Sequence, residues 1–122
     1  MTRVNLIPPE ELHYKHLVAE YREITRVPTL ARKAQREMHK KNIPPSYTMG
    51  VGHVLHFYNK LGFIADRYES LCDEMRRRGY VCNQIPRSEL LKDIDSRFVR
   101  EYNPTPEAVE LNRQRIAERM PK

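Results

Sequence analysis

The sequence predicts an all-α protein: a single compact domain of three principal helices, with an extended N-terminal arm and long irregular connections. Three observations favour this class. Apolar residues recur at helical spacing in three stretches, and no stretch alternates apolar and polar residues as a half-buried strand does. A chain of 122 residues is also long enough for one hydrophobic core and too short for two ordinary ones. We therefore expect residues 1–122 to form one domain.

The first expected element is the arm, residues 1–9, which ends at Pro8 and Pro9. A first helix should follow in EELHYKHLVAEYREI, where apolar residues are spaced i, i+4, i+7. These residues are Leu17, Tyr21 and Ile24. Pro28 should kink or restart the helix, because proline removes a backbone donor, and TLARKAQREMHK continues the helical register.

A second, long helix is expected from about His53 to Gly79, after the loop KKNIPPSYTMGVG. Its apolar positions are Leu61, Ala65, Tyr68, Cys72 and Met75. Gly79 lies where a left-handed C-terminal cap belongs. Residues 80–103 should form a long connection, with a short helical turn around SELLKDI.

The third helix is expected in TPEAVELNRQRIAERM. Thr105 is a suitable N-cap, and Pro106 suits the first helical position because its missing N–H has no intrahelical partner there. The carboxylate of Glu107 would lie near the positive end of the helix dipole.

The balance of charge indicates a polyanionic partner. Lys and Arg number 22 and Asp and Glu 16, which gives a net charge of +6 and a pI of about 9.5. Nucleic acid is the first candidate partner and an acidic membrane surface the second.

The cysteines and histidines do not indicate a metal site. Cys72 and Cys82 lack metal-ligand spacing, which suits buried thiols in a reducing cytoplasm, and His53 and His56 lack a clear third ligand. We therefore expect packing roles and no metal. The sequence has no apolar run of about 18 residues and no signal peptide, so we expect a cytoplasmic protein without a membrane span.

One face of the first helix carries polar and small residues, opposite its apolar face. These residues are Lys15, His16, Ala19, Arg22, Glu23 and Arg26. Arg22 and Arg26, four residues apart, suit phosphate oxygens, whereas Glu23 and Arg26 also fit an ordinary solvated ion pair. Arg115 and Arg119 on the last helix have the same spacing, so they fit either a second phosphate clamp or a soluble face.

Several motifs together resemble a known family. They are the start MTRVNL, then HLVAEYRE with Arg26 soon after, GVGHVLHFYNKLGFIADRYESLCDEMRRRGY, and Tyr102 with Pro104 before the last helix. This combination, spread over nearly the whole chain, resembles the pyrimidine-dimer DNA glycosylase and abasic-site lyase family, known from the phage dimer-repair endonuclease.

The resemblance implies a role for particular residues. The nucleophile would be the α-amine of Thr2, freed by removal of Met1, and the catalytic carboxylate would be Glu23. The residues expected to contact DNA are Arg3, His16, Arg22, Arg26, Arg115 and Arg119. An α-amine has a pKa of roughly 7.7–8.0, so a useful fraction is neutral at cellular pH, and Thr2 needs little activation.

The implied activity is removal of UV-induced pyrimidine dimers with coupled β-elimination, by a monomer that needs neither metal nor cofactor. Its partner would be double-stranded DNA containing damaged pyrimidines or abasic sites. The Trp- and Tyr-rich basic tail of the phage protein has no counterpart here, and the sequence has no Trp. Two alternatives therefore stay open: an enzyme mainly for abasic sites or oxidised purines, and a non-catalytic basic module that binds DNA.

Overall fold

The chain forms helices and no strands over residues 2–120, the part that this computed structural model describes. The all-α class is therefore confirmed. The helices are η1 Pro9–Glu11, α1 Tyr14–Glu23, α2 Arg26–Ala34, η2 Gln35–Lys40, η3 Leu55–Phe57, α3 Leu61–Arg77, α4 Arg87–Leu90, η4 Ser96–Phe98 and α5 Pro106–Glu118, where η marks a 3₁₀ helix.

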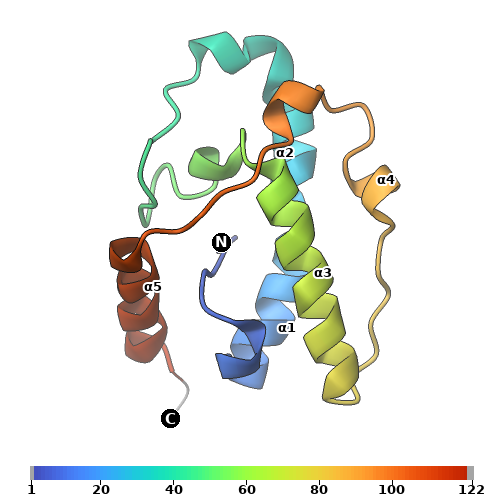
Figure 1. The fold of residues 1–122 in the computed structure, drawn as a ribbon, viewed down its shortest axis with the longest axis vertical. Coiled ribbons are helices and arrows are strands. Elements are labelled where there is room, and N and C mark those ends of the chain that lie inside the picture. Colours follow the sequence, from blue (N-terminus) through green and yellow to red (C-terminus); the bar gives the residue numbers. More distant parts are fainter. Residues whose placement is uncertain (1, 121–122) are drawn as a thin grey trace.

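The central element is α3, which contacts α1, α2 and η1 (Figure 1). Its buried apolar residues form the middle of the hydrophobic core: Leu61, Ile64, Ala65, Tyr68, Leu71, Cys72 and Met75. Leu17 of α1 and Ile24, the C-cap residue of that helix, are completely buried in the same core, as their spacing predicted, and Tyr21 packs against it. The other cysteine, Cys82, is half-buried.

The C-terminal end of α3 is capped as the sequence predicted. Gly79 has a φ of +83°, and Tyr80 N donates to Met75 O at 2.9 Å while Gly79 N donates to Arg76 O at 2.9 Å. These two bonds are the Schellman arrangement, in which a left-handed residue satisfies carbonyls at the helix end. Gly79 therefore ends the helix where expected.

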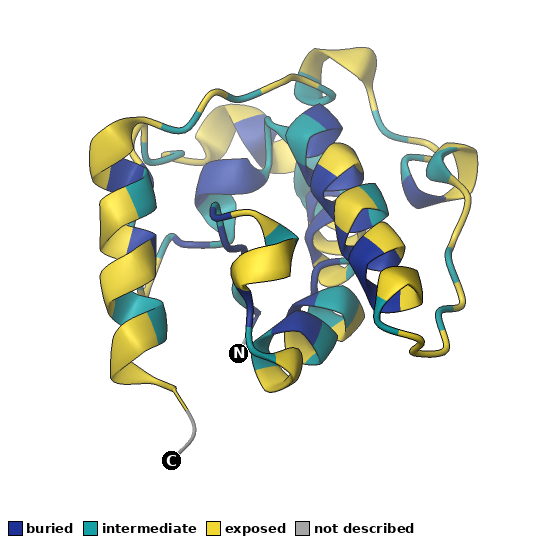
Figure 2. Cartoon of the chain, turned by 60° about the horizontal axis from the view of Figure 1, so that its bottom comes forward, coloured by how far each residue is buried: buried dark blue, intermediate teal, exposed yellow. Residues whose placement is uncertain are grey.

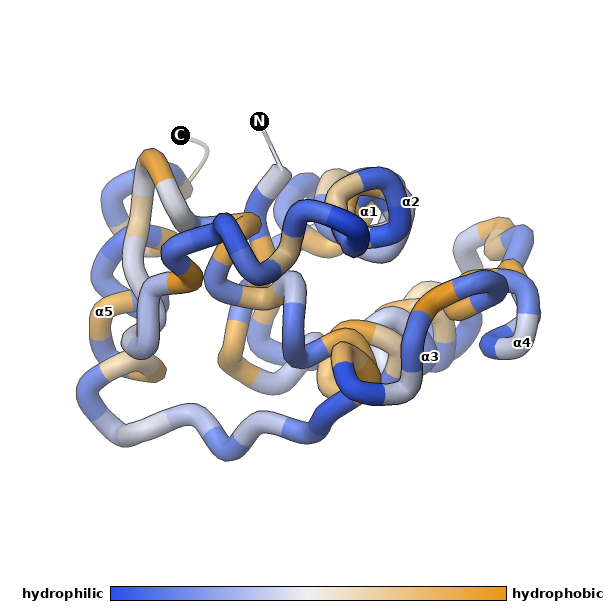
Figure 3. The backbone as a smooth tube through the Cα atoms, turned by 90° about the horizontal axis from the view of Figure 1, so that it is seen from above, coloured by the Kyte–Doolittle hydropathy of each residue, from blue (hydrophilic) through white to orange (hydrophobic). Residues whose placement is uncertain are grey.

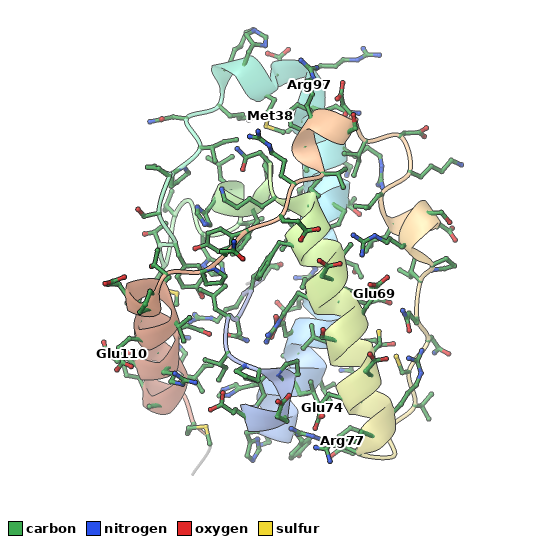
Figure 4. All side chains as sticks on the ribbon, viewed as in Figure 1. Met38, Glu69, Glu74, Arg77, Arg97 and Glu110 are labelled. Carbon is green, nitrogen blue, oxygen red and sulfur yellow. The ribbon has the colours of Figure 1, made fainter. Side chains whose placement is uncertain are left out.

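Three arginines, residues 76–78, lie in sequence at this helix end, and two of them bind one carboxylate. The side chain of Glu74 accepts hydrogen bonds from Arg77 at 2.7 Å and Arg78 at 2.6 Å, and Figure 4 shows Glu74 and Arg77 together at the end of α3. The Arg77 and Arg78 guanidinium groups lower the pKa of Glu74 to about 2. Arg78 also donates to Leu12 O at 2.8 Å, which ties α3 to the start of α1.

The predicted start of the second long helix near His53 is wrong, because α3 begins at Leu61. Gly52 has a φ of +93°, and turns and η3 occupy the chain as far as Asn59. Lys60, with φ −131° and ψ 41°, then interrupts helical geometry directly before α3. His53 and His56 are nevertheless buried packing residues, as expected.

The break between the first two helices precedes the proline. Helix α1 ends at Glu23, and α2 begins at Arg26, so Pro28 is the third residue of α2. The first four N–H groups of a helix lack intrahelical partners, and the missing proton of Pro28 therefore costs no hydrogen bond.

The two later helical predictions are confirmed. The turn expected around SELLKDI is α4. At the start of α5, the Thr105 hydroxyl oxygen accepts from Ala108 N at 3.1 Å, with Pro106 at the first helical position.

The N-terminal arm runs through the interior instead of over the surface. Thr2, Val4, Asn5 and Ile7 are all buried, and Figure 1 shows the arm between α5 and the α1–α3 pair. In Figure 2 the arm is mostly dark blue, whereas α5 is mostly yellow. No helix among residues 2–120 has the length and apolar character needed to cross a membrane.

Candidate active site

Side chains from other parts of the chain hold the backbone of the arm. Val4 N donates to His53 Nε2 at 2.8 Å, and the Tyr47 hydroxyl donates to Val4 O at 2.8 Å. The other ring nitrogen of His53 lies 2.8 Å from Thr48 O, so Nδ1 carries the proton and Nε2 is the acceptor. Burial lowers the pKa of His53 below 6.5, which favours this neutral ring.

A buried ion pair holds the next residue of the arm. Glu20 of α1 and Arg67 of α3 are 3% and 7% exposed, and Glu20 accepts from Arg67 Nε at 2.9 Å and from Nη2 at 3.0 Å. The same carboxylate accepts from Asn5 Nδ2 at 2.8 Å and from Asn5 N at 3.2 Å. Because Arg67 also donates to Ile7 O, this pair binds the arm to both helices.

Asn112 of α5 completes the set of anchors. Its Oδ1 accepts from Leu6 N at 2.7 Å and from Ile7 N at 3.3 Å, and its Nδ2 donates to Asn5 Oδ1 at 2.9 Å. An amide in a completely buried position must have such partners, since an unpaired polar group there is costly. The arm is therefore fixed relative to α1, α3 and α5 together.

A cavity of about 230 Å³ lies where these elements meet. It is lined by Arg3, Asn5, His16, Ala19, Glu20, Glu23, Arg115, Ile116 and Arg119. Of the residues predicted from the sequence, the cavity unites Arg3, His16, Glu23, Arg115 and Arg119.

The other predicted site residues lie beside this cavity. Thr2 is 7% exposed and directly precedes Arg3, whose side chain lines the cavity. Arg22 is exposed on α1 and does not line it. Arg26 Nη1 lies 3.7 Å from Glu23 Oε2, so the solvated ion pair considered for these two residues is formed.

The wall opposite Glu23 is positively charged. Burial lowers the pKa of the Arg3 guanidinium below its usual value, and the positive charges of Arg119 and Arg115 lower it further. Like charges held this close favour an anion between them, since an anion would relieve their repulsion. Arg3 Nη1 also donates to Met49 Sδ at 3.6 Å, so the loop before η3 reaches the same place.

His16 connects the two helices that form the cavity. Its Nε2 lies 3.2 Å from Arg119 O at the end of α5. If Nε2 carries the proton, Nδ1 is a buried acceptor that has no hydrogen-bond partner within residues 2–120.

Sequence reasoning missed the buried polar residues that line the cavity, Asn5 and Glu20. A signal existed for Glu20, because it lies three residues after Leu17 and four before Ile24 and so shares their buried face. Asn5 had no such signal. Within residues 2–120, no three His, Cys, Asp or Glu side chains lie together as metal ligands would.

The comparison with protein families agrees with the resemblance seen in the sequence. A family model described as pyrimidine dimer DNA glycosylase matches residues 1–86, which include the arm, α1, α2 and α3. The match ends before α5, so Arg115 and Arg119 lie outside it. Since the matched residues make up more than half of the 122, the chain belongs to the pyrimidine dimer DNA glycosylase family.

Proposed function

We propose that the protein is a DNA-repair glycosylase with coupled abasic-site lyase activity on UV-induced pyrimidine dimers. The Thr2 α-amine, freed by loss of Met1, would be its nucleophile. One observation carries the proposal: Arg3, the neighbour of Thr2, and Glu23 line the same cavity, with arginines of α5 on the other side. An amine, a carboxylate and phosphate-binding groups are the groups that this chemistry requires.

In the first step, the amine nitrogen attacks C1′ of the deoxyribose at the damaged nucleotide. The bond from C1′ to the base breaks, its electron pair leaves with the base, and a proton goes to the base. Positive charge develops on the sugar in this step, and the Glu23 carboxylate is suited to stabilise it.

In the second step, the sugar ring opens as the C1′–O4′ bond breaks and O4′ takes a proton, which leaves an imine between enzyme and sugar. Removal of a C2′ proton then forms a C2′=C3′ bond and expels the 3′ phosphate, so the strand is cut. Glu23 is the residue that we assign to these proton transfers, because its side chain, 24% exposed, is the more accessible of the two carboxylates that line the cavity.

The arginines bind the strand on which this chemistry occurs. Arg3, Arg115 and Arg119 would take the phosphates beside the lesion, and the exposed Arg22 and Arg26 would take phosphates farther along. The cavity is below the roughly 300–1,000 Å³ of pockets that enclose a drug-sized ligand. Its size of about 230 Å³ suits one part of a nucleotide more than a whole oligonucleotide.

The test is borohydride trapping on a duplex that contains one dimer. Borohydride reduces an imine to a stable amine, so the wild-type protein should become covalently attached to the DNA, and peptide mapping should find the adduct on Thr2. A chain with one extra residue before Thr2 has its α-amine displaced and should give no adduct.

The other outcomes separate the alternatives. DNA binding without an adduct on any lesion would indicate a non-catalytic binding module and refute the proposal. Faster trapping on an abasic or oxidised-purine duplex than on the dimer duplex, in direct competition, would keep the amine chemistry and reject the dimer as the main substrate.

A further inference from the structure

The loop between η2 and η3 has an apolar tip that the chemistry above does not use. Val51 is 102% exposed, so its side chain contacts essentially nothing in the protein. Single exposed apolar residues are common on protein surfaces and need no explanation by themselves. Two further features set Val51 apart from such residues: the structure of its loop and the position of that loop beside the arm.

The tip is held in one shape by glycines and hydrogen bonds. Gly50 and Gly52, on either side of Val51, have φ values of +72° and +93°. Residues with a Cβ rarely adopt such values. A Cβ on Gly52 would also lie 3.1 Å from Pro44 Cγ. His53 N donates to Gly50 O at 3.1 Å, which closes the turn around Val51. The valine is thus presented by a structured turn.

The loop is attached to the arm that carries the proposed nucleophile. The His53 ring joins Thr48 O to Val4 N, at 2.8 Å each, and Met49 Sδ accepts from the Arg3 guanidinium at 3.6 Å. Two residues of chain span at most about 7 Å, so Val51 follows within that distance of the residue that contacts Arg3. The start of the arm and the end of α5 lie on the same side of the molecule in Figure 3.

Proteins that kink DNA commonly insert an apolar side chain between base pairs, and the deformation exposes the target nucleotide. A fully exposed, β-branched side chain suits this use, because it has few rotamers to lose and gains apolar contacts only when the stack opens. The adjoining arginines supply the attraction for phosphates that brings the duplex to the loop.

We propose that Val51 is a wedge that enters the base stack beside the lesion and helps to open it for the Thr2 amine. This inference rests on the proposed function, and it adds the element that displaces the bases. The duplex partner is the damaged double strand itself, and the wedge enters it near the phosphate held by Arg3, because Met49, two residues before Val51, contacts the Arg3 guanidinium.

The test compares Val51→Ser with wild type on two dimer substrates. One is fully paired, and the other lacks the bases opposite the lesion, so its stack is already open. Val51→Ser should slow single-turnover trapping about tenfold on the paired duplex, which corresponds to ~1.4 kcal/mol, and little on the open one. A 2-aminopurine opposite the dimer should brighten on binding of wild type and much less with the variant.

Val81→Ser is the matched control, since Val81 is also an exposed valine, at 83%, but follows the far end of α3 (Figure 1). It should behave as wild type on both substrates. Equal slowing of Val51→Ser on both duplexes, or unchanged rate and fluorescence, would overturn the wedge. Wild type that traps neither duplex would instead refute the proposed function, so the two failures are distinct.

Discussion

Two glutamates of α1, three residues apart, should respond oppositely to the same conservative change. Glu20→Gln should strongly lower the stability of the fold. Glu23→Gln should leave the stability unchanged and abolish most strand cleavage. Both side chains line the cavity, so the prediction depends on what else each of them contacts. Glu20 is 3% exposed and paired through two hydrogen bonds with Arg67, whereas Glu23 pairs with the exposed Arg26 at 3.7 Å.

The magnitudes follow from these environments. Removal of the Glu20 charge leaves Arg67 buried without its counter-charge, and breaking such a pair costs about 3–5 kcal/mol. That is a large share of the roughly 5–15 kcal/mol by which a domain is stable. A loss of stability of this size should lower Tm by roughly 10–20 °C. Loss of the Glu23–Arg26 pair costs ~0.5 kcal/mol or less, since it lies at the surface.

Strand cleavage should show the opposite pattern, with the large loss in Glu23→Gln. Without the Glu23 carboxylate, cleavage should fall by roughly 10²–10⁴-fold, the usual contribution of an acid–base group. Thermal unfolding followed by circular dichroism measures the first effect, and single-turnover cleavage of a dimer duplex well below Tm measures the second. Wild-type Tm for Glu20→Gln, or wild-type cleavage by Glu23→Gln, would refute the assignment of structural and chemical roles.

Three further predictions concern the anchors and the charged wall. Arg119→Ala should reduce the slope of log K for DNA binding against log salt by about one phosphate contact, whereas Arg113→Ala on the same helix, which pairs with Glu11 at 3.1 Å, should not change it. Asn112→Leu should lower the free energy of unfolding by about 2–4 kcal/mol in urea titrations, because it removes a buried acceptor for two backbone donors. The folded pKa of His53 is below 6.5, so its stabilising contribution is complete above pH 6.5 and is lost as pH falls below it. His53→Gln should flatten this decrease in Tm, and an unchanged profile would contradict the role of the neutral ring.

Much of the helical framework could be predicted from local signals. The apolar spacing of Leu17 and Ile24, the glycine after α3 and the Thr105 cap each act within a few residues, and each appears in the structure as expected. The false helix start at His53 has a local cause too. Apolar residues three apart, such as Val54 and Phe57, occur in a 3₁₀ turn as well as in an α-helix. The apolar pattern alone therefore does not show that the segment before Leu61 is the 3₁₀ helix η3 and not the first turns of α3.

The geometry of the site could be predicted only in part. The resemblance gave Arg3, His16 and Glu23, but no local pattern shows that the arm passes through the core. Its contacts join residues far apart in the chain: Asn5 to Asn112, and Glu20 to Arg67. A side chain such as that of Asn112 reads from the sequence as one more polar position on a charged helix, and only the folded chain shows what it holds.

Helix α5 lines the cavity of the candidate site even though the family match ends at residue 86. An extended segment in the interior has no neighbouring strand to pair its N–H and C=O groups, so the arm requires side chains as hydrogen-bond partners. Asn112 satisfies the Leu6 and Ile7 amides, while Arg115 and Arg119, one and two turns later, face the cavity. One helix thus both holds the arm and forms the positive wall. We therefore expect the position of the proposed nucleophile and the proposed binding of phosphate to be coupled, so a change that displaces α5 should weaken both together.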